Sequence, residues 1–388
     1  MSTQNSLYTR LDKLISMPSI SSASPRLDTS NAPVIHYLAE CFEDLGFTSE
    51  LVPSEGTAQQ NSGNQKLNLI ATRGEGPGGL VLAGHTDTVP LDEELWQQNP
   101  FKLTEKDGRL YGLGCTDMKA FFPLIMEALK SFEGVDFKQP LIVLATADEE
   151  TSMQGARTIA ELGRPKARAA IIGEPTGMRP IMAHKGIMME SIDLLGQSGH
   201  SSDPSLGHNA LDAMHSVISE LIKFREELSQ QYQSNLFEIP RPTLNLGCIH
   251  GGDNPNRICG HCHLEYDMRL LPGMEIEAMR SAIASRIAPI AERFGVKAQV
   301  KPLFPGLPAF MTDPNSELVK TAERLTGNQA AAVAFGTEGP LLQKLGMDTI
   351  ILGPGDIDQA HQPDEYLAVE RIRPFVKVLE DLISHYCL

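Results

Sequence analysis

The stretch LIVLATADEETS (141–152) joins a strand suited to burial to three acidic residues in succession. Its first seven residues are apolar apart from one threonine, and Asp148, Glu149 and Glu150 follow directly. Bringing carboxylates out of water is costly unless something positive meets them. The stretch therefore predicts a buried strand whose end carries acids that need a partner.

Similar short apolar runs lie on both sides of this strand in the sequence. They are LNLIATR (67–73), GGLVLAGHTDTVP (78–90) and AAIIGEPT (169–176), and helical patterns at 117–132 and 153–163 lie between them. Apolar strands separated by helices predict a parallel or mixed sheet that is covered on both faces. Binding sites in such sheets gather where the strands end.

A different pattern occupies residues 182–304. Alternating strands surround two amphipathic helices, at 210–228 and 275–293, in the order β-α-β-β-α-β. This order predicts a small ferredoxin-like α+β domain with its helices on one face of the sheet. We therefore expect an α/β catalytic domain in two parts, 1–181 and 305–388, with the α+β domain inserted between them.

Composition narrows the class of protein. The 388 residues carry a formal net charge of −16, which argues against nucleic acid as the main partner, although solubility alone also explains such a charge. The N-terminus lacks the pattern of a secretory signal, and no apolar run approaches the roughly 18 residues of a membrane span. Six scattered cysteines do not indicate a disulfide scaffold. We expect a cytoplasmic protein that acts on a small molecule and binds neither nucleic acid nor membrane.

Histidines and acids gather at the ends of the predicted strands. His85 and Asp87 are two residues apart on an extended segment, so their side chains share one side. Asp117, Glu174 and His361 follow other apolar or glycine-rich segments. One such acid is usually a helix cap or a solvated turn residue. Imidazole and carboxylate together instead suit a pair of divalent cations, with one carboxylate bridging them and a free glutamate moving protons.

Six motifs in order resemble the co-catalytic zinc amidohydrolase family: GHTDTVP, GLGCTDMK, ADEET, IIGEPT, GHSSDP and AHQPDEY. The resemblance covers nearly the whole chain. It implies a catalytic domain with an inserted lid or dimerisation domain, two divalent metal ions and a homodimer. Zinc is the metal it implies first, with cobalt as the alternative.

The resemblance also implies the metal ligands. Asp117 matches the carboxylate that bridges both ions. The resemblance assigns His85 and Glu174 as ligands of one metal, and Glu150 and His361 as ligands of the other.

Further roles follow from the same resemblance. Glu149 matches the general base, and Asp87 the residue that orients His85. His200 resembles a lid histidine that stabilises the oxyanion, from its own or the partner subunit; without the resemblance, a turn residue is an equal alternative. Asp148 has no family role, so we expect a strand-end or capping residue.

The chain departs from the family at one motif. The family usually continues DMKGG, whereas here Ala120 and Phe121 follow Lys119. Both are expected within the helix, where alanine is favourable, so metal binding should survive. Cys115, two residues before Asp117, is expected to be a small buried filler.

The segment CIHGGDNPNRICGHCH (248–263) leaves a structural zinc site open as an alternative, because it contains a CxxC pair. On a strand, however, Cys259 and Cys262 would face opposite sides. The segment also aligns with a lid strand of the family, which favours a role in the lid.

Substrate-binding residues are also implied by the resemblance. Asn256 and Arg269 match groups that hold a substrate carboxylate, for which arginine is well suited, and Lys185 is a weaker candidate. Glu338, beside Thr337, is a candidate partner for a cationic substrate side chain, with a structural hydrogen bond as the alternative.

Several motifs most resemble the acetylornithine deacetylase branch of the family, which forms L-ornithine and acetate from N2-acetyl-L-ornithine in arginine biosynthesis. Another N-acyl amino acid hydrolase, such as a succinyl-diaminopimelate desuccinylase or an aminoacylase, is the first alternative. A non-enzymatic metal-binding protein that retains the fold is the second.

Overall fold

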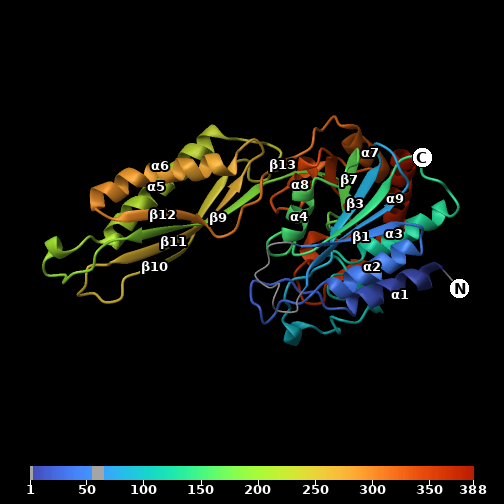
Figure 1. Cartoon of the computed structure of the whole chain (residues 1–388), viewed down its shortest axis with the longest axis horizontal. Helices are drawn as coiled ribbons and strands as arrows, with labels where there is room; N and C mark the ends of the chain where they lie inside the picture. The colour runs from blue at the N-terminus through green and yellow to red at the C-terminus, as the bar shows by residue number, and fades with distance from the viewer. Residues whose placement is uncertain (1–2, 55–64) are drawn as a thin grey trace. The chain divides into compact units, whose positions relative to one another are not determined.

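The computed structural model describes residues 3–54 and 65–388 (Figure 1). The tract 53–66 is polar, which predicts an exposed loop or hairpin tip, and most of it lies outside the described residues. On either side of that tract, β1 (Thr48–Pro53) and β2 (Leu67–Arg73) pair antiparallel.

The chain forms two compact units. Unit 1 comprises Met1–Met182, Thr312–Ala331 and Thr337–Leu388, and unit 2 comprises Ala183–Met311 and Ala332–Gly336. The predicted domain boundaries, at 181/182 and 304/305, stay a prediction.

A mixed sheet forms the centre of unit 1, in agreement with the predicted fold class. β3, β6, β7 and β15 run parallel to their neighbours among these four, and the strands on either side run antiparallel. All residues of β3, β6 and β7 are buried, so both faces of the sheet are covered. The order is β1, β2, β6 (Leu141–Thr146), β3 (Leu80–His85), β7 (Ala169–Ile172), β15 (Asp348–Ile351) and β8 (Ile181–His184). The chain passes from unit 1 to unit 2 within β8, which also pairs with β13 (Phe310–Met311) of unit 2 and with β14 (Ala331–Val333).

Helices and a small second sheet complete unit 1. The helices are α1 (Thr3–Ile15), α2 (Ala32–Glu43), α3 (Phe121–Leu129), α4 (Gln154–Leu162), α7 (Glu317–Thr326), α8 (Gly339–Lys344) and α9 (Ile372–Cys387). The small sheet has the order β16 (Tyr366–Ala368), β5 (Arg109–Tyr111) and β4 (Thr104–Lys106).

The start of α3 differs from the sequence-based expectation. Ala120 occupies the N-cap position, and the helix begins at Phe121 rather than before it. Pro123 lies in the first turn, where its missing N–H is not needed for an intrahelical bond.

Topology explains why polar residues meet in unit 1. β3 lies between β6 and β7 and is parallel to both, so the carboxyl ends of the three strands lie at one edge of the sheet. His85 ends β3 and is paired with Thr146 of β6, two residues before the acidic run begins at Asp148. Glu174 lies two residues after the end of β7. His85 is therefore placed between the acidic run and Glu174.

Two glycines directly before these residues leave room for large side chains. A Cβ at Gly84 would collide with the Met118 side chain, and one at Gly173 with the Phe121 ring. Both bulky side chains are buried. The Phe121 ring, at a position where the chain departs from the DMKGG pattern, thus occupies the space that Gly173 leaves.

Unit 2 contains an antiparallel sheet with the order β10 (Thr243–Gly251), β11 (His261–Leu270), β9 (Gly186–Leu195) and β12 (Lys297–Pro302). Along β11 every second residue is buried. Figure 1 shows α5 (Ala210–Gln231) and α6 (Ile276–Phe294) along one side of this sheet. The β-α-β-β-α-β order predicted from the sequence is confirmed, and the other face of the sheet carries the polar residues.

Within residues 3–54 and 65–388, no helix has both the length and the apolar character that crossing a membrane requires.

Candidate metal centre

The structure brings the predicted metal ligands together in unit 1. Ligand atoms of His85, Glu149 and Glu174 lie within 4.8 Å of one another, and so do those of His85, Asp117 and Glu150. The side chain of His361 joins the second group through Glu150. These residues come from five separate segments of the chain, so only the folding of the chain brings them together.

Asp117 lies between the two histidines. Its Oδ1 is 2.9 Å from His85 Nε2, and its Oδ2 is 3.4 Å from His361 Nε2. Glu174 Oε1 lies 3.7 Å from the same His85 nitrogen, and Glu150 lies 3.1 Å from His361 Nε2. The result is two histidine–glutamate pairs joined by one carboxylate, an arrangement with room for two cations and one bridging ligand.

The electrostatics of this cluster favour cations. Burial raises the pKa of Glu149 well above its usual value, and the charge of Glu174 raises it further. Burial and the Asp117 charge likewise raise the pKa of Glu174 and of Glu150. Hydrogen bonds to Asp117 and Glu150 raise the pKa of His361 to about 10. Imidazole and carboxylate donors suit borderline divalent ions, so the residues present fit a pair of such ions.

Asp87 is positioned to orient His85. The His85 Nδ1 atom lies 3.0 Å from the Asp87 carbonyl oxygen and 3.7 Å from its Oδ1. The Asp87 Oδ2 accepts a hydrogen bond from the Glu150 backbone N–H at 3.1 Å. Oδ1 is buried and has no hydrogen-bond partner in the described part of the chain. Asp87 thus links the backbone of the acidic run to the ring of His85, whose other nitrogen faces Asp117.

Asp148, the first acid of the run, contacts a different set of residues. Its Oδ1 pairs with Lys66 Nζ at 2.9 Å and accepts a hydrogen bond from Ser21 Oγ at 3.0 Å. Its backbone has a φ of 58°, and its carbonyl oxygen accepts hydrogen bonds from the Ser152 and Met153 N–H groups. Asp148 therefore stabilises the turn after β6, in line with the structural role expected for it.

Glu365 is a positioning residue that sequence reasoning missed. Its buried carboxylate accepts hydrogen bonds from the backbone N–H groups of Gly114 (2.9 Å), Thr116 (2.6 Å) and Asp117 (2.9 Å). Burial raises its pKa to about 8, although these hydrogen bonds act in the opposite direction. Glu365 fixes the loop that carries Asp117. The available signal was an acid four residues after His361 in the same motif.

Glu338 and Thr337 lie at the start of α8 in unit 1. Glu338 is buried, and neither carboxylate oxygen has a hydrogen-bond partner within the described residues. Burial raises its pKa to about 7, and its charge in turn raises the pKa of Glu149 and Glu174. Thr337 accepts a hydrogen bond from the Gly339 N–H at 3.2 Å. Glu338 is thus a buried carboxyl group close to the metal centre.

The remaining candidates, His200, Asn256, Arg269 and Lys185, belong to unit 2. His200 is exposed, and its Nδ1 lies 2.7 Å from Ser202 Oγ. The next residue, Ser201, donates its N–H to the Asn256 carbonyl oxygen at 3.0 Å. His200 and Asn256 therefore lie on adjacent segments.

The two cationic candidates of unit 2 differ in their contacts. Lys185 Nζ donates hydrogen bonds to the carbonyl oxygens of Ile239 at 2.8 Å and Arg241 at 2.7 Å. Arg269 Nε donates to Asp267 Oδ1 at 3.0 Å, and its side chain is 31% exposed. Lys185 is thus engaged by the backbone, whereas the partly exposed Arg269 is the better candidate for an anion.

The cysteines occupy separate environments. Cys115 is completely buried, as is Cys262, whereas Cys259 precedes β11 and donates its thiol to the His261 carbonyl oxygen at 3.1 Å. Cys115 and Cys262 therefore pack as small apolar residues.

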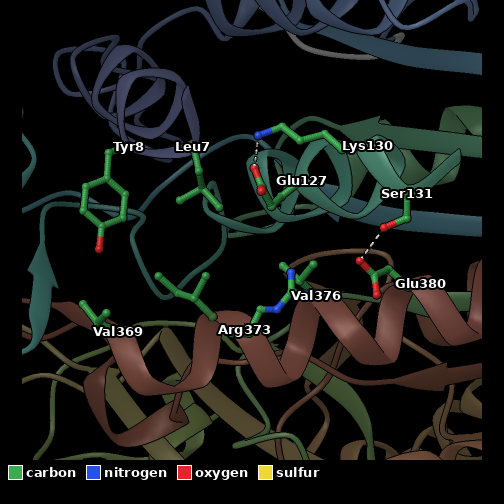
Figure 2. A pocket seen from close by; sticks show the side chains of 10 residues that line it. Leu7, Tyr8, Glu127, Lys130, Ser131, Val369, Arg373, Val376 and Glu380 are labelled. Atoms are coloured by element: carbon green, nitrogen blue, oxygen red, sulfur yellow. Dashed lines mark hydrogen bonds and ion pairs between the residues drawn. The ribbon is translucent and has the colours of Figure 1, made fainter. Parts of the chain in front are cut away.

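A larger hollow elsewhere in unit 1 contains none of the predicted site residues. It measures about 670 Å³ and is lined by residues of α1, α3 and α9 (Figure 2). Lys130 pairs with Glu127 at 2.6 Å, and Ser131 donates a hydrogen bond to Glu380 at 2.7 Å. Lys130 and Glu127 thus neutralise each other, and the size of the hollow alone does not mark it as the reaction site.

Comparison with known proteins agrees with this geometry. The model of the peptidase family M20/M25/M40 matches residues 81–385. The chain belongs to this family. A tripeptidase from Staphylococcus aureus is similar in structure, with a TM-score of 0.74 and 21% identity over 99% of this chain and 98% of that one.

Two Bacillus structures extend the comparison. An aminopeptidase from Bacillus cereus has a TM-score of 0.74 and 20% identity over 98% of each chain. A Bacillus subtilis protein described as a dinuclear metal binding peptidase of the M20 family has a TM-score of 0.67 and 15% identity, over 98% of this chain and 99% of that one. At these identities the structural matches show a shared fold.

Replacing Glu365 should weaken metal binding. Glu365→Ala leaves three backbone N–H groups without their acceptor and releases the loop that carries Asp117, so we expect metal affinity to fall about 10–100-fold. Metal content after dialysis against a graded chelator series measures this. Glu370→Ala, at an exposed acid nearby, is the matched control and should behave as wild type. Equal metal retention in both variants would remove Glu365 from the positioning role.

Removing the metals should make stability depend on pH. Without cations, Glu149, Glu150 and Glu174 have raised pKa values, so the folded protein binds more protons than the unfolded chain. Their stabilisation is present at low pH and is lost as pH rises through the folded pKa values. The contributions of His85 and His361 to stability are also lost as pH rises, since their pKa values are raised in the folded protein.

We therefore expect the difference in Tm between metal-loaded and metal-free protein to widen from about pH 5.5 to pH 8. Calorimetry on chelator-treated and reloaded samples measures both values. Asp117, whose pKa is lowered, acts in the opposite direction, but only below about pH 4. A difference that stays constant or shrinks with rising pH would contradict this electrostatic account.

Proposed function

We propose that this chain hydrolyses the amide bond of N2-acetyl-L-ornithine to give L-ornithine and acetate, using two divalent metal ions. The observation that carries the hydrolytic part is Asp117, whose two carboxylate oxygens face His85 and His361 beside the half-buried Glu149. We propose zinc as the metal, with cobalt as the alternative. His85 and Glu174 would hold one ion, Glu150 and His361 the other, and Asp117 both.

The cations, when bound, would polarise the amide carbonyl and lower the pKa of the attacking water. Glu149 is the proton carrier in this proposal. It is half-buried, and its raised pKa suits a group that accepts a proton from water and then donates it to the leaving amine. Asp87 holds the His85 ring in the ligating orientation. His200 is proposed as the lid donor to the developing oxyanion.

Recognition of an N-acylated diamino acid needs groups for both of its charges. Glu338 offers a buried carboxyl group without a hydrogen-bond partner among the described residues, and this suits the side-chain ammonium of the substrate. Arg269 and Asn256 are proposed to bind the substrate carboxylate, since a guanidinium can donate two hydrogen bonds to it. Lys185 is the weaker candidate because two backbone carbonyls already engage its ammonium.

Two enzymatic alternatives use the same centre. A desuccinylase or aminoacylase would keep the centre and change the groups around the acyl amino acid. A peptidase is supported by the description of the similar Staphylococcus aureus and Bacillus cereus proteins as peptidases. A metal-binding protein without catalysis is the remaining alternative. Operation as a cytoplasmic homodimer in arginine biosynthesis belongs to the same proposal.

A substrate panel separates these functions. Metal-loaded protein should turn over N2-acetyl-L-ornithine with a higher kcat/KM than N-succinyl-diaminopimelate, N-acetylmethionine, a dipeptide or a tripeptide. Glu338→Gln should lower kcat/KM for acetylornithine about ten- to hundredfold, the scale of a lost charged hydrogen bond, and should affect N-acetylmethionine far less. A higher kcat/KM for a peptide would contradict the deacetylase proposal and favour a peptidase. No turnover of any substrate at full metal occupancy would favour the non-enzymatic alternative.

Glu149→Gln tests the proton carrier. Removing a general base should lower kcat by at least about a hundredfold, while two metal ions per chain remain bound. Steady-state kinetics and metal analysis on the same sample measure the two quantities. Glu161→Gln, at an exposed acid on α4, provides the matched control and should keep full activity. Loss of a metal ion from Glu149→Gln would instead make Glu149 a ligand.

A further inference from the structure

A second group of metal-ligating side chains lies in unit 2, on the face of the four-stranded sheet that α5 and α6 leave uncovered. His261 and His263 are on β11, and Asp193 is on the adjacent strand β9. The Asp193 Oδ1 atom lies 2.9 Å from His261 Nε2 and 2.9 Å from His263 Nδ1. One carboxylate oxygen thus contacts nitrogens of two imidazoles, and none of these residues has a role in the proposed hydrolysis.

The strand register fixes the spacing of these groups. His263 is directly opposite Asp193, and His261 is two residues away on the same face of β11. Directly opposed residues in an antiparallel pair have Cβ atoms about 5 Å apart, and diagonal neighbours are within reach of long side chains. The backbone therefore places two imidazoles on one face of the sheet with the Asp193 carboxylate between them.

Glu265 completes a relay on the same strand. Its Oε1 lies 3.1 Å from His263 Nε2, the ring nitrogen that points away from Asp193. Metal-bound histidines characteristically donate their other ring N–H to a carboxylate, which fixes the tautomer and the ring orientation. With Glu265 in this position, His263 Nδ1 is directed toward Asp193 and the place a cation would occupy.

Further soft donors adjoin the group. His250 of β10 is directly opposite His263, and Cys248 Sγ lies 3.0 Å from His250 Nε2. A hollow of about 420 Å³ beside His261 is lined by His250, Ser198 and Asp253 together with glycines. The His261 side chain is 53% exposed, so its ring is accessible to an ion from solvent.

We propose that His261, His263 and Asp193 form a binding site for a borderline divalent transition metal such as Zn²⁺ on the open face of the unit 2 sheet. Two imidazoles and a carboxylate are the donors such ions prefer, and Glu265 orients His263 from behind. This site differs from the CxxC alternative of the sequence analysis, because Cys262 is buried on the opposite face between the two histidines. A bound ion would connect β9 to β11 by metal–ligand bonds.

Calorimetric titration of the full-length chain with Zn²⁺ tests this site. The protein is first loaded with Zn²⁺ and freed of excess metal, so that the metal centre of unit 1 is occupied. Wild type should then bind one further Zn²⁺ per chain. His263→Gln and His261→Gln should each weaken this binding at least tenfold, and Glu265→Gln about 10–100-fold.

His215→Gln is the matched control, since His215 is an exposed histidine of unit 2 on α5 and should leave the titration unchanged. Circular dichroism verifies that every variant is folded. Because only the difference between wild type and the unit 2 variants is used, the result does not depend on the function of unit 1. No additional Zn²⁺ binding by wild type, or equal binding by folded His263→Gln, would overturn the proposal.

Discussion

Repulsion among buried carboxylates is the constraint on which the metal centre of this protein depends. Glu149, Glu150, Glu174 and Asp117 lie around His85 near the carboxyl ends of three buried strands; Glu174 and Asp117 are buried, and Glu149 and Glu150 are half-buried. The raised pKa values of the three glutamates express the cost of that arrangement. Divalent cations offset this cost directly, so the same feature that destabilises the metal-free fold creates affinity for metal.

Three residues around the metal centre position its ligands and the loops that carry them. Asp87 connects His85 to the backbone of the acidic run, and Glu365 holds the loop that carries Asp117 through three backbone hydrogen bonds. Asp148 pairs with Lys66 and stabilises the turn from which the two glutamates project. Each support acts on the backbone or on the far side of a ligand, so the ligating atoms remain available for cations.

The two units use the same donor types on different scaffolds. In unit 1, parallel strands end together and collect acids from distant segments at one edge of the sheet. In unit 2, antiparallel pairing places His261, His263 and Asp193 side by side across two strands, on the face left uncovered by helices. The first scaffold buries its charges, and the second leaves them partly exposed. The carboxylates of unit 1 therefore favour cation binding more strongly than those of unit 2.

The sequence by itself determined the type and order of the main elements, because alternation and helical periodicity are local properties of the chain. It also indicated the family, through motifs that lie at strand ends. The match of the M20/M25/M40 family model to residues 81–385 shows that the chain belongs to that family. Tertiary structure alone decided that Asp148 pairs with Lys66 rather than with the metal centre, that Glu365 holds the Asp117 loop, and that Lys185 is engaged by backbone carbonyls. These contacts join residues between 54 and 251 positions apart, so no local pattern could have revealed them. Strand pairing likewise brought the histidines of β11 to Asp193, because the register between strands is set by packing and not by either strand alone.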